Sequence, residues 1–121
     1  SHHDLGMTYK EMGLMEEAAR EFETAATGED NLAHSLEMLG ECYLDLSRFE
    51  EAHDLFQRLL PDLEGDGKAR IHLHLGRSYE GMGEWDKAEE AYFAALELNV
   101  DRVEAVEILE GLEQRRERGA A

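Results

Sequence analysis

The sequence predicts an all-α fold: an α-solenoid of three helix-turn-helix repeats plus a C-terminal capping helix, about seven helices in total. The chain of 121 residues contains a single proline, Pro61, and very few of the polar–apolar alternations that form strands. The phrase Leu-Gly-x-x-Tyr occurs at residues 5–9, 39–43 and 75–79, and its leucines are 34 and 36 residues apart. A period near 34 with helical character is typical of helix-turn-helix solenoids.

The first helix of each predicted repeat carries the Leu-Gly-x-x-Tyr phrase. Glycine inside a helix costs about 1 kcal/mol relative to alanine, so the matching phase of Gly6, Gly40 and Gly76 requires a packing reason. We expect the backbone of the facing helix to approach too closely for a side chain. Gly40→Leu should therefore destabilise the fold, by roughly 1–3 kcal/mol, as overpacking does. Gly13 and Gly83 should end the first helices as left-handed caps.

The second helix of each repeat carries an apolar stripe with the spacing i, i+4 and i+7. Its members are Ala18, Phe22 and Ala25; Ala52, Phe56 and Leu59; and Ala88, Tyr92 and Ala95. The first alanine of each set should form the small surface that faces the glycine. In the second repeat Ser47 stands where the other repeats have a capping glycine, and Ser47 with Glu50 also predicts a capping box for the next helix.

The residues after the third repeat predict a capping helix near 101–118. Val103, Val106, Leu109 and Leu112 form a one-sided apolar stripe. We expect this stripe to cover the last repeat, because the end of a solenoid otherwise presents apolar surface to water.

We expect residues 1–121 to form a single domain, with repeats near 1–30, 31–66 and 67–100 before the capping helix. Leu109 follows Leu75 by 34 residues, as the start of a fourth repeat would. The chain is therefore predicted to be a segment of a longer protein. Its first three residues, Ser-His-His, also fit the remnant of a tag.

Taken together, these motifs resemble the tetratricopeptide repeat (TPR) family over about residues 3–100. The resemblance rests on Leu5, Gly6, Tyr9, Gly13, Ala18, Phe22 and Ala25, with their counterparts in the other two repeats. The early tryptophan of the family's first helix is missing, and a proline near a repeat end is present only as Pro61. The resemblance implies a non-enzymatic module that binds a peptide or protein surface in a concave groove lined by the first helices. The alternative is a structural scaffold segment that stacks on neighbouring repeats or self-associates.

The family pattern also indicates which side chains face this groove. The second repeat contributes three carboxylates spaced four residues apart, and the third contributes two arginines spaced seven apart, each set on one helical face. The carboxylates should attract basic groups of a partner, and the arginines should attract acidic ones. Methionine adapts to irregular apolar surfaces, so the partner should combine this mixed charge with a hydrophobic anchor. A solvated helix face remains the alternative interpretation. The candidate partner-binding residues are Met7, His34, Glu37, Met38, Glu41, Leu44, Asp45, Arg70, His74 and Arg77.

Some TPR domains hold a C-terminal carboxylate with a Lys/Asn/Arg clamp. The positions of the first-repeat lysine and asparagine hold His3 and Met7 here, and His34 or Met38 stands where the second repeat needs asparagine. Only Arg70 and, weakly, His74 fit the clamp. This pattern disfavours binding of a chaperone tail.

Composition narrows the classes of partner. A net charge of −17 argues against nucleic acid and anionic membranes, since both need positive charge on the protein. The longest apolar runs are too short for a transmembrane helix. A single cysteine, Cys42, excludes an internal disulfide framework and favours a reducing compartment, here predicted to be the cytoplasm.

The sequence predicts no catalytic residue, cofactor or metal site. His72 and His74 are two residues apart and so lie on different helical faces, without the second histidine at i+4 that a metal site needs. Residues 62–67 imitate the first half of a calcium loop, but the closing glutamate would fall at Leu73. The two glycines of that stretch instead predict a flexible turn. Cys42 has no basic neighbour in sequence that would favour its thiolate.

Overall fold

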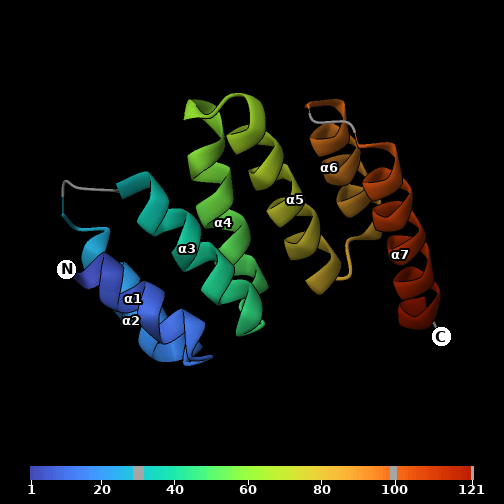
Figure 1. The fold of residues 1–121 in the computed structure, drawn as a ribbon. Coiled ribbons are helices and arrows are strands. Elements are labelled where there is room, and N and C mark those ends of the chain that lie inside the picture. The colour runs from blue at the N-terminus through green and yellow to red at the C-terminus, as the bar shows by residue number, and fades with distance from the viewer. Residues whose placement is uncertain (29–31, 99–100, 121) are drawn as a thin grey trace. The chain divides into compact units, whose positions relative to one another are not determined.

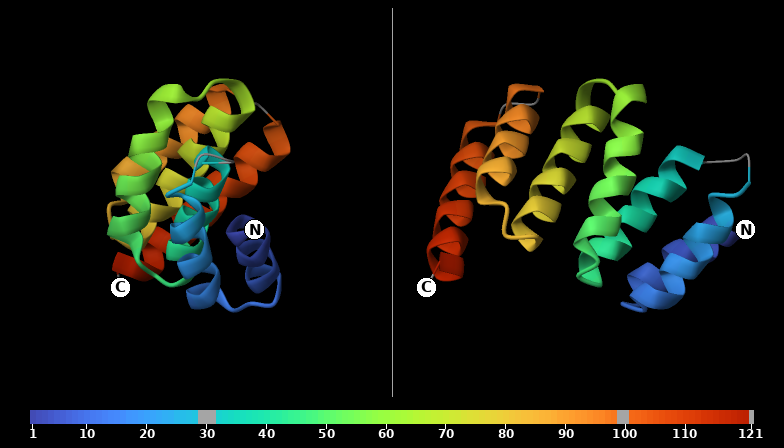
Figure 2. Two further views of the ribbon diagram at one scale, coloured as in Figure 1. Left: turned by 90° about the vertical axis from the view of Figure 1, so that its left-hand side faces the viewer. Right: turned by 180° about the vertical axis from the view of Figure 1, so that it is seen from behind.

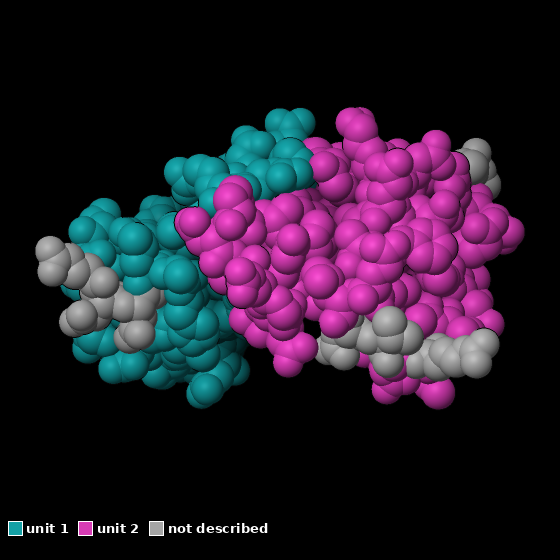
Figure 3. Space-filling model, turned by 90° about the horizontal axis from the view of Figure 1, so that it is seen from above, with its two compact units in different colours: residues 1–59 teal, residues 60–121 magenta. Residues whose placement is uncertain are grey.

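The computed structural model describes residues 1–28, 32–98 and 101–120, and within these ranges the fold is all-α, as predicted. The predicted number of helices, seven, is confirmed there, and one 3-10 turn accompanies them (Figure 1). The chain forms two compact units, residues 1–59 and residues 60–121 (Figure 3), which are described in turn. The helices are α1 (His2–Glu11), α2 (Met15–Ala25), α3 (Leu32–Asp45), α4 (Phe49–Leu59), α5 (Gly65–Gly81), α6 (Trp85–Leu98) and α7 (Arg102–Ala120).

Unit 1 contains α1 to α4, and each helix packs against the next one along the chain (Figures 1 and 2). Its core is built from small and aromatic side chains on α2 and from apolar side chains on α3 and α4. The buried members are Ala18, Ala19, Phe22, Met38, Leu39, Cys42 and Leu55. The predicted pairing of a first and a second helix in each repeat is therefore confirmed for both repeats of this unit.

The repeated glycines face aromatic rings, and the prediction that they face a close backbone is wrong. A Cβ atom added to Gly40 would lie 2.5 Å from ring atoms of Phe56. The equivalent distances are 2.8 Å from Gly6 to Phe22 and 2.3 Å from Gly76 to Tyr92. Since these rings are almost fully buried, they have no room to move away from a side chain.

In each repeat, one residue with a left-handed backbone lies in the turn between the two helices. Gly13 has φ 79° and Gly83 has φ 74°, as predicted for caps, and Ser47 adopts φ 59° at the same place in the second repeat. The N–H of Arg48 donates to the carbonyl of Tyr43 at 2.8 Å, which closes a Schellman-type turn. The three turns thus share one backbone conformation in spite of the serine.

The predicted capping box of Ser47 and Glu50 is wrong. The carbonyl of Arg48 accepts the first hydrogen bond of α4, from the N–H of Ala52 at 3.0 Å. Arg48 is therefore the N-cap residue. Ser47 belongs to the turn that ends α3, so its hydroxyl is one residue too early to cap α4.

Unit 2 contains the 3-10 turn Leu60–Asp62 and helices α5, α6 and α7, which pack in sequence. Its core includes Ala88, Tyr92 and Leu112, with Trp85 and Ile108 packed against them. The turn predicted over residues 62–67 is shorter than expected. α5 already begins at Gly65, where φ is +56°, so the second glycine of the stretch lies inside the helix.

The capping helix covers the third repeat with only the C-terminal half of the predicted stripe, Leu109 and Leu112, together with Ile108. Leu112 is 2% exposed and Ile108 packs beside it, whereas Val103 is 67% exposed and Val106 is 51% exposed. Leu109 is half-buried. The prediction that α7 packs on the last repeat is correct, but its two valines face away from the core of unit 2.

Charged side chains complete the attachment of α7. Arg115 donates from Nε to Glu80 on α5 at 2.9 Å, and Arg116 donates from Nη2 to Asp86 on α6 at 2.7 Å. Burial raises the pKa of the Tyr92 hydroxyl well above its usual value, and the carboxylate of Glu80 raises it further. Tyr92, Glu80 and Arg115 therefore form a polar chain that joins three helices.

Gly40→Ala should destabilise the protein by roughly 1–3 kcal/mol, because the new methyl group overlaps the buried ring of Phe56. Gly67→Ala is the matched control, since its Cβ would lie no closer than 3.7 Å to a neighbour in the first turn of α5. It should stabilise by up to about 1 kcal/mol. Urea unfolding followed by circular dichroism measures both. If both substitutions changed the free energy of unfolding equally, the contact between Gly40 and the Phe56 ring would not explain the glycine.

Ser47→Gly should stabilise the protein by roughly 1 kcal/mol, because a left-handed backbone strains every residue that has a side chain. The reciprocal change Gly13→Ser should destabilise by a similar amount, since Gly13 has the same turn geometry. The midpoint of urea unfolding reports both. If the two changes shifted the midpoint in the same direction, backbone strain would not explain the turn.

Candidate functional site

The first helices of unit 1 meet along a ladder of side chains. His3 lies against His34, with 3.1 Å between His3 Nε2 and His34 Nδ1 and 4.7 Å between the ring centroids. Two turns further along, Lys10 Nζ lies 3.9 Å from Glu41 Oε1. Both pairs join residues 31 positions apart in sequence. The sequence interpretation missed this cross-helix pairing, because spacing within one helix does not reveal it.

Methionines occupy the middle of the same ladder. Met7 and Met38 are also 31 residues apart, and Met7 packs against the core cluster that contains Met38. Met38 is only 8% exposed, so it is a core residue and cannot serve as the predicted surface anchor for a partner. Leu44 is half-buried at the other end of α3.

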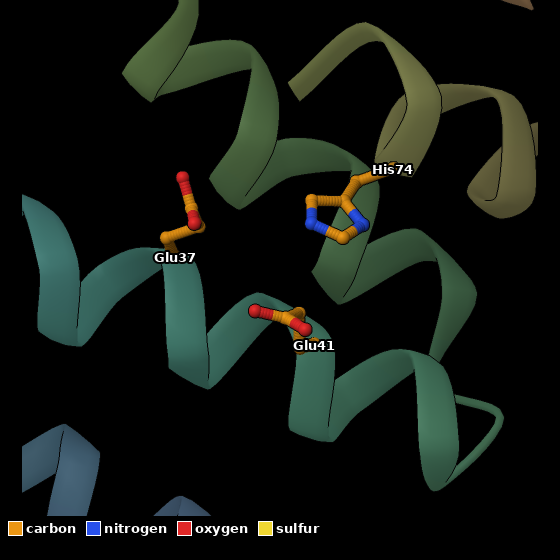
Figure 4. A group of neighbouring side chains, drawn as sticks. All are labelled: Glu37, Glu41 and His74. Atoms are coloured by element: carbon orange, nitrogen blue, oxygen red, sulfur yellow. The ribbon is translucent and has the colours of Figure 1, made fainter. Parts of the chain in front are cut away.

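The predicted acidic face of α3 has three different environments. Glu37 and Glu41 project from successive turns of the helix (Figure 4), but Glu37 is 8% exposed and Glu41 is half-buried and paired with Lys10. Asp45 is exposed. The acidic potential of this face is therefore concentrated at its C-terminal end, around Glu41 and Asp45.

Unit 2 presents its candidate residues on α5. Arg70 and Arg77 are exposed and lie two turns apart. His74 lies between them on α5 (Figure 4). It is 7% exposed. Arg77 donates from Nη1 to His74 Nδ1 at 3.2 Å. The two arginines thus form the cationic face predicted from the sequence, and the histidine supports one of them.

A hollow of about 240 Å³ lies beside Arg70, between α5, α6 and α7. Four apolar and three charged side chains line it: Asp66, Ala69, Arg70, Leu73, Ala95, Leu96 and Glu104. The sequence interpretation did not predict this hollow, although the sequence contains one feature that indicates it. Ala95 stands where the second repeat has Leu59, so the third repeat lacks side-chain volume at this place.

Other residues singled out in the sequence show no features of catalytic groups. Burial raises the pKa of the Cys42 thiol to about 11, which disfavours the reactive thiolate at neutral pH. Burial lowers the pKa of His72, and the charge of Lys68 lowers it further. The hydroxyl of Tyr43 donates to Glu23 at 3.0 Å, and burial together with this bond raises the pKa of Tyr43 to about 12.

Comparisons with known proteins agree with the repeat pattern. One family model described as tetratricopeptide repeat matches residues 3–67, and another with the same description matches residues 71–119. Over 82 residues the chain is 29% identical to the general transcriptional corepressor trfA of Dictyostelium discoideum. This match covers 68% of the chain and 6% of that protein, so the chain corresponds to a small part of it. None of the helices in the described ranges combines the length and apolar character that a membrane span requires.

Proposed function

Because the chain belongs to the tetratricopeptide repeat family, we propose that it is a non-enzymatic module that binds a protein or peptide segment through its first helices. These helices line the groove in the family. The observation that supports the proposal is the face of α5, which carries two exposed arginines, one of which, Arg70, lines a hollow that also contains four apolar side chains. Burial of an apolar side chain yields about 1.5–3 kcal/mol, and arginine holds carboxylates with charge-assisted hydrogen bonds.

In this proposal the hollow in unit 2, rather than Met38, binds the hydrophobic anchor of the partner. An apolar cavity of about 150 Å³ holds a benzene ring, so 240 Å³ admits a side chain the size of leucine or phenylalanine. Arg70 stands at its edge, where it can hold a carboxylate next to that side chain. In unit 1, Asp45 and Glu41 offer a separate surface for lysine or arginine. The proposed partner is a segment of mixed charge with a hydrophobic anchor.

The net charge and the single cysteine bear on the compartment of the protein and on which classes of partner it can bind. The strongly acidic chain should avoid nucleic acid and anionic membranes, and the buried thiol of Cys42 suits the cytoplasm.

Peptides selected from a displayed library of random 12-residue sequences should contain an apolar residue next to an acidic one. Their affinity for Arg70→Glu with Arg77→Glu should fall at least tenfold and should lose part of its salt dependence, since exposed ion pairs are screened. Lys87→Glu with Arg118→Glu makes the same change in net charge on other exposed faces of unit 2. Fluorescence anisotropy in a series of salt concentrations measures all three proteins.

Ala95→Leu should weaken the same peptides, because it fills the hollow with the side chain that the second repeat carries. On α3, Glu41→Lys with Asp45→Lys should weaken basic peptides, and Glu50→Lys with Glu51→Lys on α4 should not. If all variants keep the fold and the affinity of the parent chain, the first helices are not the binding surface. If control and test pairs weaken binding equally, net charge alone governs it.

The second candidate function is a scaffold segment that stacks on further repeats or on a second copy. It is favoured by exposed apolar side chains in unit 2: Phe93 is 46% exposed on α6, and Val103 and Val106 are more than half exposed on α7. A high net negative charge opposes self-association of identical chains. Sedimentation over a concentration series separates the two functions, because self-assembly shifts with concentration and peptide binding does not require it.

A further inference from the structure

We propose that unit 1 contains a binding site for a soft monovalent metal ion, Cu(I), formed by two imidazoles and two thioethers. The ligands are His3 and Met7 on α1 and His34 and Met38 on α3. This inference does not depend on the proposed function, because it concerns the contact between α1 and α3 rather than a partner protein.

The two imidazoles already have the separation that a shared metal requires. His3 Nε2 and His34 Nδ1 lie 3.1 Å apart. Two nitrogens bound to one tetrahedral metal at about 2.0 Å lie about 3.3 Å apart. A metal ion between them therefore needs only a small movement of either ring.

The remaining nitrogen of His3 is held by a second hydrogen bond. Its Nδ1 lies 2.9 Å from the hydroxyl oxygen of Ser35, which is 0% exposed on α3. When Nδ1–H donates to this oxygen, the lone pair of Nε2 points toward His34. Histidines that bind metals usually donate their second N–H in this way, which fixes the tautomer and the ring orientation. The buried ring of Phe22 lies 5.6 Å from the His3 ring and further restricts it.

The thioethers stand on the next turn of each helix. Met7 follows His3 by four residues and Met38 follows His34 by four residues, so each pair shares one helical face. Side chains of a helix lean toward its N-terminus and over the preceding turn. We therefore expect both methionines to lean toward the histidines, and Met7 packs against the core cluster that contains Met38.

The donor set selects a soft ion. Thioethers favour Cu(I), whereas imidazole alone also suits zinc, nickel and Cu(II). All four ligands are neutral, so the complex has one positive charge, which an acidic protein attracts. The competing interpretation is that the histidine pair is a hydrogen bond that joins α1 to α3 and binds nothing.

The test is a titration of the protein with Cu(I) under reducing, oxygen-free conditions, in competition with a coloured Cu(I) chelator. We expect one ion per chain. His34→Gln should lower the affinity at least tenfold, since His34 is exposed and its loss spares the core. Met7→Leu with Met38→Leu should also lower it at least tenfold while conserving apolar volume. X-ray absorption of the bound copper should show both nitrogen and sulfur neighbours.

The matched controls are His2→Gln and Met12→Leu, which remove an exposed histidine from the start of α1 and the exposed methionine that follows its last residue. They should bind Cu(I) like the parent chain, as should Cys42→Ala. Cu(I) should raise the thermal midpoint of the parent chain and not that of His34→Gln, because a ligand of the native state stabilises it. Absence of binding, equal binding by every variant, or loss of binding in Cys42→Ala would overturn the proposal. Retention by the double methionine variant would overturn thioether ligation.

Discussion

A buried aromatic ring lying over a helical glycine fixes each pair of helices in this protein, and the positions of the other side chains depend on it. The ring of Phe56 leaves no space for a Cβ at Gly40, and the same contact recurs in the other two repeats. It sets the rotation of a first helix about its axis relative to its partner. With 3.6 residues per turn, the residues one and five positions after Gly40, Glu41 and Asp45, then point well away from the ring. The packing contact thus decides which side chains remain for recognition.

Side chains on these first helices do not all remain available for a partner. In unit 1, Lys10 pairs with Glu41 and His3 lies against both His34 and Ser35, so much of this surface connects α1 to α3. In unit 2, Arg70 of α5 lies beside a hollow instead, and Arg77 is exposed two turns further along the helix. The two units therefore use the same repeat pattern differently. In unit 1 many polar side chains of the first helices make contacts between repeats, whereas in unit 2 Arg70 lies beside a hollow lined partly by apolar side chains.

The sequence predicted the fold class well because its signals are local. A glycine, an aromatic residue and a left-handed turn recur at fixed spacing, and each has a structural requirement that few residue types meet. It predicted the candidate site less well, because burial depends on neighbours that are distant in sequence. Met38 has the spacing of a groove residue, but α2 supplies the side chains that bury it. The hollow is likewise formed by the smallness of Ala69 and Ala95, which becomes visible only when three helices are brought together.

The capping helix shows why an apolar stripe alone did not identify its buried face. The predicted stripe of Val103, Val106, Leu109 and Leu112 has a constant spacing of three residues, which drifts around a helix of 3.6 residues per turn, so its two ends lie on opposite faces. The third repeat, however, carries Tyr92 where the others have phenylalanine, and its hydroxyl lies next to Glu80. Glu80 in turn accepts hydrogen bonds from Arg115. A buried polar group needs its partners, so this carboxylate favours the rotation of α7 that brings Arg115 to it. That rotation buries the face with Leu112 and leaves the two valines in solvent.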